Sequence, residues 1–255
     1  MKTLYILSVS ILFTGTCLAR VSRESAHASA PMAVDQIEQT INGICKKHNI
    51  SGFNAPSEDI DKVHREGGNA TYGEITPAGL SELIKHLEPI TEQDLWVDLG
   101  SGVGKVVIQV VLETLASALG AELAHARIEG AQRVKQELVN QGILKDPSRL
   151  TFKEENITKT PLNEATIVFM CSTCFSDELM NAIVNNAKSA PRLRYLISLK
   201  PLPAESQSAF ALKETLTLPM TWSSMTPVNI YVPVKKPINA KVRIQAPIKR
   251  RTAAH

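Results

Sequence analysis

Apolar and polar residues alternate along this chain in a pattern that predicts strands followed by helices. A short apolar run at residues 95–99 leads into a glycine-rich turn, and beyond the turn apolar residues recur at the three- and four-residue spacing of a helix. Strand and helix patterns then alternate as far as residue 199. Such an alternation is typical of α/β folds, in which helices cover a mostly parallel sheet.

The last two predicted strands follow each other without a helix between them. They cover residues 210–222 and 228–234, with a short link around Pro227, and therefore predict an antiparallel hairpin at the edge of the sheet. The earlier predicted elements are helices at residues 106–119, 126–140 and 177–188 and strands at residues 120–123, 150–156, 165–172 and 195–199.

The segment before the glycine-rich turn has a weaker pattern. Residues 31–70 begin with apolar residues at helical spacing between positions 37 and 44, and a polar stretch at 54–61 is interpreted as a loop. We therefore expect a small helical N-terminal module there and a larger domain over residues 71–234. Pro77, after a threonine, predicts the start of a further helix.

The glycine-rich turn is the first candidate for chemistry. Glycines at positions 100, 102 and 104 leave no β-carbons in the turn, so backbone N–H groups can approach a ligand closely. Asp98 closes the preceding strand, and the G-x-G-x-G spacing differs from the patterns of dinucleotide folds and of phosphate-binding loops. The turn is interpreted as a cofactor cradle, and a purely structural turn is the alternative.

Polar residues at the ends of the next two strands extend this interpretation. Glu122 lies 24 residues after Asp98, where a carboxylate can accept hydrogen bonds from both hydroxyls of a ribose. Asn156, at the end of the third strand, is a candidate to pair with an adenine amino group, and Ile157 is a candidate to cover the adenine face. A surface glutamate and a plain strand end are the alternatives.

The first 30 residues resemble a signal peptide. Lys2 is followed by an apolar run at residues 4–13 and by small residues that offer cleavage sites, and the run is too short to span a bilayer. We expect export to the periplasm or the medium; lipidation at Cys17 is the weaker alternative. Without this segment three cysteines remain, and they predict no disulfide framework.

Charge is distributed unevenly along the chain. The net charge is +3, and seven cations without an acidic residue lie between positions 235 and 251, which leaves −4 for the rest. A basic tail over residues 235–255 predicts a polyanionic partner, with DNA contacted by the cations, and a solvated terminus is the alternative. The seven cations are Lys235, Lys236, Lys241, Arg243, Lys249, Arg250 and Arg251.

Several motifs together resemble one protein family, the "disruptor of telomeric silencing" histone lysine methyltransferases. The motifs are Tyr72-Gly73-Glu74, the segment VDLGSGVGKVVIQV at residues 97–110, the spacing of Glu122, the segment SLKP at residues 198–201, and residues 221–231, which begin Thr-Trp and end Pro-Val-Asn-Ile-Tyr. The resemblance covers about residues 71–234. It implies a class I methyltransferase domain with a Rossmann-like, mostly parallel α/β sheet, and S-adenosylmethionine as cofactor.

The resemblance also implies which residues bind the cofactor. They are Tyr72, Gly73, Glu74, Ile75, Asp98, Leu99, Gly100, Ser101, Gly102, Val103, Gly104, Lys105 and Glu122. Asn156 and Ile157 stand where the family has an aspartate and a phenylalanine that hold adenine, so adenine recognition is expected to be altered.

A second departure lies at the acceptor side. Cys171 stands where the family has an asparagine at the mouth of the lysine channel. Cys174 completes a C-x-x-C pair, but the chain has no second pair and no suitably spaced histidine, so we expect a buried thiol and no metal. Tyr231 is expected to form a channel wall, and Tyr72 is expected to lie near the methyl group.

Methyl transfer from a sulfonium to an amine needs alignment and desolvation rather than a covalent nucleophile. Three functions therefore stay open. The favoured one is methylation of a lysine on nucleosomal histone H3 by an exported bacterial protein that is delivered to a host nucleus. The others are methylation of a non-histone protein lysine, and a non-catalytic module that binds the cofactor or nucleic acid.

Overall fold

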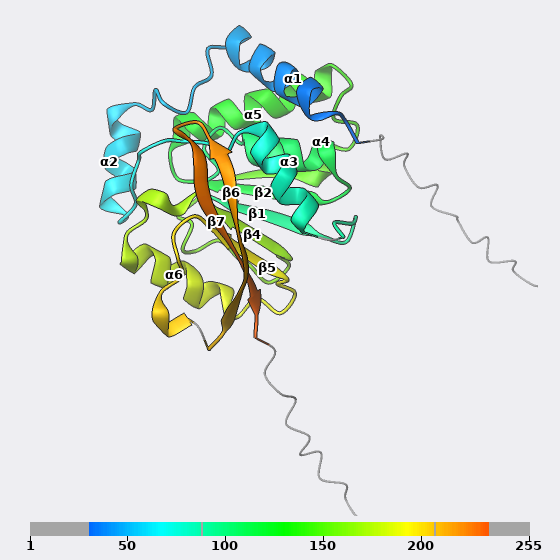
Figure 1. Ribbon diagram of the computed structural model, residues 1–255. Helices are drawn as coiled ribbons and strands as arrows, with labels where there is room; N and C mark the ends of the chain where they lie inside the picture. Colours follow the sequence, from blue (N-terminus) through cyan, green and yellow to red (C-terminus); the bar gives the residue numbers. More distant parts are fainter. Residues whose placement is uncertain (1–30, 88, 207, 235–255) are drawn as a thin grey trace, which may run out of the picture.

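A computed structural model describes residues 31–87, 89–206 and 208–234, and these form a seven-stranded sheet covered by helices on both faces (Figure 1). The strand order is β3-β2-β1-β4-β5-β7-β6, in which the first five are parallel and the last two antiparallel. The strands are β1 Leu95–Leu99, β2 Ser117–Glu122, β3 Leu150–Glu154, β4 Ile167–Met170, β5 Tyr195–Ser198, β6 Phe210–Met220 and β7 Ser223–Pro233. This mixed sheet confirms the predicted α/β class and the antiparallel edge.

The helices divide between the two faces because side chains alternate along each strand. Trp96 points into a core shared with α1, α3, α4 and α5, whereas its neighbour Val97 points into the core beneath α6. Figure 1 shows α6 apart from α1, α3, α4 and α5. The α-helices are α1 Val34–Lys47, α2 Ser57–Arg65, α3 Pro77–His86, α4 Lys105–Glu113, α5 His125–Asn140 and α6 Asp177–Ala187.

One boundary was wrong in the prediction of the first helix after the turn. The helix predicted over 106–119 ends at Glu113, and β2 begins at Ser117 rather than at 120. Every residue of β2 after Ser117 is buried, and the first five residues of the strand pair with β1 in register. A parallel strand buried on both faces shows no alternation, so its apolar residues continued the helical pattern.

The N-terminal segment also differs from its prediction. The polar stretch interpreted as a loop contains most of α2, which begins after Pro56 with two acidic residues in its first turn. Helix α1 buries Ile37, Ile41 and Ile44 in the same core as α3 and α4, so the packing continues across the boundary drawn at residue 70.

The hairpin turns earlier than the sequence predicted. Its turn lies at Thr221 and Trp222, and Pro227 sits inside β7 opposite Thr217. Proline is tolerated there because β5 pairs only with positions 229–231, so this part of β7 has β6 as its single neighbour.

None of the helices in the described part of the chain is long and apolar enough to cross a membrane. The predicted signal peptide at residues 1–30 and the basic tail at residues 235–255 lie outside the described residues.

The glycine-rich turn has the backbone that only glycine adopts without strain. Gly104 has φ +79°, and a β-carbon there would lie 2.4 Å from the ring of Phe152. Gly104 therefore lets α4 start directly against β3.

Replacing Gly104 by alanine should destabilise the fold by about 1–3 kcal/mol, since it adds left-handed strain and overpacking. Gly43 is the matched control, because it lies inside α1 with nothing within 4 Å of a β-carbon. Gly43→Ala should stabilise the protein by about 0.5–1 kcal/mol. Urea unfolding of both variants measures the two effects, and equal signs would contradict this account of the turn.

Candidate functional site

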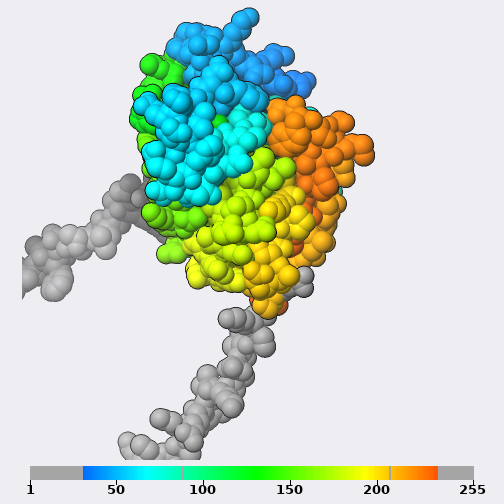
Figure 2. Space-filling view, turned by 90° about the vertical axis from the view of Figure 1, so that its left-hand side faces the viewer, coloured from blue at the N-terminus to red at the C-terminus, as the bar shows by residue number. Residues whose placement is uncertain are grey.

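A cavity of about 310 Å³ opens at the carboxyl ends of the central parallel strands. This is the end of an α/β sheet where ligands usually bind. Its lining comes from the loop at residues 71–75, the ends of β1, β2 and β4, the C-terminal end of α2 and the hairpin turn. Figure 2 shows the segment that contains this loop, in cyan, lying against the orange hairpin.

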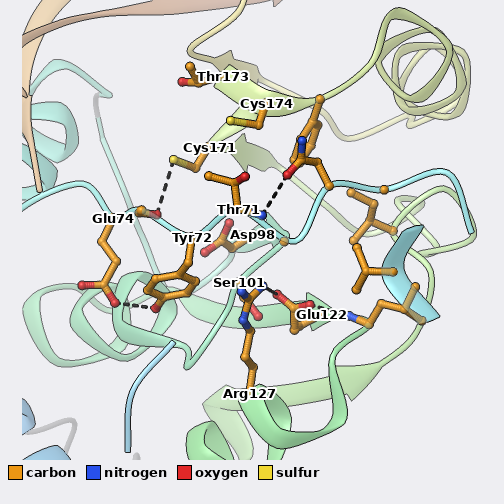
Figure 3. Close-up of a pocket in the computed structure, with 18 of the residues that line it drawn as sticks. Thr71, Tyr72, Glu74, Asp98, Ser101, Glu122, Arg127, Cys171, Thr173 and Cys174 are labelled. Carbon is orange, nitrogen blue, oxygen red and sulfur yellow. Dashed lines mark hydrogen bonds and ion pairs between the residues drawn. The ribbon is translucent and has the colours of Figure 1, made fainter. Parts of the chain in front are cut away.

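Tyr72 joins the loop at residues 71–75 to the glycine turn and to α5. Its hydroxyl donates to Glu74 Oε1 at 2.5 Å, and the Arg127 guanidinium lies 4.8 Å from its ring centroid (Figure 3). Burial and the Glu74 carboxylate raise the pKa of the phenol, which therefore stays protonated and donates. A β-carbon at Gly102 would lie 2.4 Å from the ring, so the glycine turn and this loop fit against each other only without one.

Glu74 connects this loop to two other elements. Its Oε2 accepts from Lys105 Nζ at 2.9 Å, at the start of α4. Its backbone pairs with Thr221, whose N–H donates to the Glu74 carbonyl at 2.8 Å. Lys105 and Glu74 therefore hold the loop in place between α4 and the hairpin.

Glu122 lies where the sequence placed it, at the end of β2 and in the wall of the cavity. Its carboxylate accepts from the backbone N–H of Gly102 at 3.0 Å and from those of Leu123 and Ala124 at 2.9 Å. A carboxylate has about four acceptor positions, so three are used by the protein. The side chain joins the glycine turn to the start of α5.

Asp98 brings a second buried carboxyl group to the cavity, and burial followed by the nearby Glu122 charge raises its pKa to about 8. Its Oδ1 is buried without a hydrogen-bond partner among the described residues, and so is the hydroxyl of Ser101 beside it. Figure 3 shows both side chains between Tyr72 and Glu122. Two unpaired polar atoms in one cavity wall are a place where a polar ligand can bind.

Several predicted cofactor residues lie behind the cavity surface rather than in it. Ile75, Gly100 and Lys105 line the cavity together with Gly73, whereas Leu99, Gly102, Val103 and Gly104 are absent from its lining. Leu99 is fully buried in the core under α6. Gly102, Val103 and Gly104 shape the turn, and Leu99 ends β1.

Tyr231 does not form a wall of the cavity, which corrects that prediction. It is buried in the core beneath α6, and its hydroxyl accepts from the N–H of Leu202 at 3.2 Å. The strand alternation explains the error, because it turns this residue of β7 toward α6. Trp222, in the hairpin turn, lines the cavity instead. Its ring packs directly on Gly73, where a β-carbon would lie 2.4 Å from the ring.

Cys171 does line the cavity, and its thiol faces Gly73. The Sγ lies 3.7 Å from the Gly73 carbonyl oxygen (Figure 3). Burial, and after it the charge of Asp98, raises the pKa of the thiol to about 12, so it is uncharged at neutral pH. Cys174 lines the same wall but is exposed.

Asn156 and Ile157 both line the cavity, but both ends of the Asn156 amide already have partners in the protein. The Asn156 Oδ1 accepts from the N–H and the hydroxyl of Thr158 at 3.0 and 2.8 Å, and Nδ2 donates to Glu66 at 2.8 Å. An oxygen that is already used twice cannot also accept from an adenine amino group.

Sequence reasoning missed Glu66, Arg127, Phe175 and Trp222, which all line the cavity. Arg127 donates to the carbonyls of Gly52 and Ala70 at 3.1 and 2.7 Å, contacts that no local motif reveals. Glu66 lay in a segment interpreted as part of a small N-terminal module. Trp222 lies within the motif at residues 221–231, and that motif was the signal that could have placed it in the cavity.

Comparisons with known proteins agree with this geometry. Residues 55–232 match the family described as "Histone methylation protein DOT1". A histone-lysine N-methyltransferase specific for H3 lysine-79 from Emericella nidulans is 27% identical over 154 residues, which are 57% of this chain and 30% of that protein. Its counterpart from Chaetomium globosum is 28% identical over 138 residues, which are 51% of this chain and 27% of that protein.

The chain therefore matches less than a third of the length of these curated relatives. Among solved structures, geranyl diphosphate C-methyltransferase from Streptomyces coelicolor has a TM-score of 0.51 at 13% identity, over 71% of this chain and 99% of that one. That likeness concerns the fold alone. With the match across residues 55–232, the chain belongs to the DOT1 histone methylation protein family and has the α/β fold of class I methyltransferases.

Proposed function

We propose that this protein is an S-adenosylmethionine-dependent protein-lysine N-methyltransferase whose acceptor is a lysine on nucleosomal histone H3. The observation that carries the proposal is the convergence of the loop at residues 71–75, the glycine turn and Glu122 on one cavity, within a chain that matches the family over residues 55–232. The relatives named for lysine-79 of histone H3 support the acceptor class.

The cavity wall fits this cofactor. S-adenosylmethionine carries an ammonium and a sulfonium, and the wall offers an unpaired carboxyl oxygen at Asp98 and an unpaired hydroxyl at Ser101. The two cations that line the cavity, Lys105 and Arg127, already lie beside Glu74 and Glu122, so they leave Asp98 available to a ligand cation.

The cofactor, when bound, supplies a methyl group that is already activated by the positive sulfur. The protein then has to align the amine, exclude water and keep the amine uncharged. Trp222 and Phe175 give the cavity apolar walls, and the neutral Cys171 thiol adds no charge near the acceptor. No side chain needs to form a covalent intermediate.

One observation favours a second candidate, a non-histone lysine as acceptor. By the resemblance, Cys171 stands where the family has an asparagine, and its thiol, which faces the Gly73 carbonyl, offers no amide to orient the acceptor amine. A lysine in another protein, presented by different contacts, is therefore the alternative acceptor.

Glu122→Ala should weaken S-adenosylmethionine binding by roughly 10- to 100-fold, or about 1.5–3 kcal/mol, because it removes a charge-assisted contact and releases the glycine turn. Calorimetry measures the affinity, and circular dichroism checks that the variant folds. Glu129→Ala, on the exposed side of α5, is the matched control and should bind like the parent. Unchanged affinity in a folded Glu122→Ala protein would remove Glu122 from the site.

Cofactor binding should release a proton near pH 7. Asp98 has a pKa of about 8 in the free protein, above its value of 3.8 in an unfolded chain, so the carboxyl is mostly neutral below pH 8. A bound cation favours the charged carboxylate, lowers this pKa and releases the proton. Calorimetry in two buffers of different ionisation enthalpy measures the release, and Asp98→Asn should abolish it. Identical heats in both buffers for the parent protein would contradict the pairing.

Methylation of nucleosomes should depend on the basic tail. If the tail contacts DNA, replacing Lys249, Arg250 and Arg251 by glutamine should lower methylation of nucleosomes far more than of free histone. It should also flatten the salt dependence by roughly one counterion per lost contact. Labelled cofactor with nucleosomes, free histones and unrelated proteins, read by mass spectrometry, gives the rates and the modified lysine.

The control replaces three exposed cations of the folded body, Arg133, Lys145 and Lys159, by glutamine. It matches the charge change and should leave nucleosome methylation near the parent level. Equal activity of the tail variant and the parent on nucleosomes, across salt, would favour the non-histone acceptor. Cofactor binding without transfer to any acceptor would indicate the non-catalytic module.

A further inference from the structure

The Asn156 side chain has a fixed orientation at one end of the cavity. The Thr158 backbone N–H can only donate, so the atom that accepts from it must be the amide oxygen of Asn156. The same oxygen accepts from the Thr158 hydroxyl, and the amide nitrogen donates to Glu66 Oε2 at 2.8 Å. Asn156 therefore presents only a donor hydrogen to a ligand.

Glu66 lies exposed at the rim of this end of the cavity. It is the C-cap residue directly after α2, and its backbone N–H donates to the Lys62 carbonyl at 3.2 Å. Its carboxylate accepts a hydrogen bond from the amide of Asn156, 90 residues along the chain. Among the described residues, Asn156 is the one donor that binds this carboxylate, so the carboxylate keeps acceptor positions for a ligand.

The surrounding side chains suit a flat aromatic ring. Val63, Leu123 and Ile157 line the cavity from α2, the end of β2 and the end of β3. The ends of β2 and β3 are adjacent, because the Glu155 N–H donates to the Glu122 carbonyl at 3.0 Å. This end of the cavity therefore joins apolar walls to one carboxylate and one amide donor.

We propose that Glu66 is the specificity-determining residue that accepts a hydrogen bond from the exocyclic amino group of the cofactor's adenine. Asn156 positions Glu66 and donates its second amide hydrogen to a ring nitrogen. An amino group needs an acceptor, and Glu66 supplies the one that Asn156 lacks. This proposal rests on the proposed use of S-adenosylmethionine.

The test compares two ligands by calorimetry, independently of any methyl transfer. The probes are S-adenosylhomocysteine and its analogue without the 6-amino group of the purine. The parent protein should bind the analogue on the order of tenfold more weakly. The Glu66→Ala variant should bind S-adenosylhomocysteine about tenfold more weakly than the parent does, and should bind the analogue with the parent's affinity. The ratio of the two affinities then approaches one.

Two further variants complete the experiment. Glu58→Ala removes an exposed carboxylate from the same helix outside the cavity, and should keep the parent's ratio. Asn156→Ala keeps Glu66 but removes its hydrogen-bond donor, and should reduce the ratio of the two affinities only in part. Thermal unfolding confirms that each variant is folded.

The outcomes separate this proposal from the proposed function. The same ratio in Glu66→Ala as in the parent, with tight binding of S-adenosylhomocysteine, would overturn the role of Glu66 and leave the cofactor assignment intact. A parent protein that binds neither ligand would overturn both.

Discussion

The ring of Tyr72 lies in space that two glycines leave open, and the whole site depends on that fit. A β-carbon would lie 1.9 Å from the ring at Gly52 and 2.4 Å at Gly102. The loop at residues 71–75 can therefore pack directly on the glycine turn. Arg127 lies over the ring and donates to the carbonyls of Gly52 and of Ala70, which directly precedes this loop.

That packing brings several carboxylates to one cavity, and their charge decides which ligand suits it. Glu66, Glu74, Asp98 and Glu122 all line the cavity, whereas its cations lie beside Glu74 and Glu122. Burial beside Glu122 makes the charged form of Asp98 costly, which its pKa of about 8 reflects. A cationic ligand offsets this cost and an anionic one adds to it, so the electrostatics favour a positively charged cofactor.

Local patterns predicted the parts of the fold and site that local chemistry determines. The glycine turn, the strand before it and the position of Glu122 follow from residue type and spacing within 30 residues. The start of β2 did not, because a strand buried on both faces has no alternation to read. Glu66 and Arg127 were missed for a different reason: their partners are far along the chain, and only the folded topology brings them together.

Asn156 and Cys171, the two expected departures from the family pattern, both line the cavity, and their side chains have different partners. At the Asn156 end, the amide donates to the carboxylate of Glu66, directly after α2, and this contact is the basis of the proposed adenine acceptor. At the Cys171 end, the thiol faces the Gly73 carbonyl, and the amide oxygen of Asn69, which also lines the cavity, accepts from the Thr71 N–H at 2.8 Å. For the proposed lysine acceptor, the apolar side chains of Trp222 and Phe175 would add a shaped wall to these polar groups.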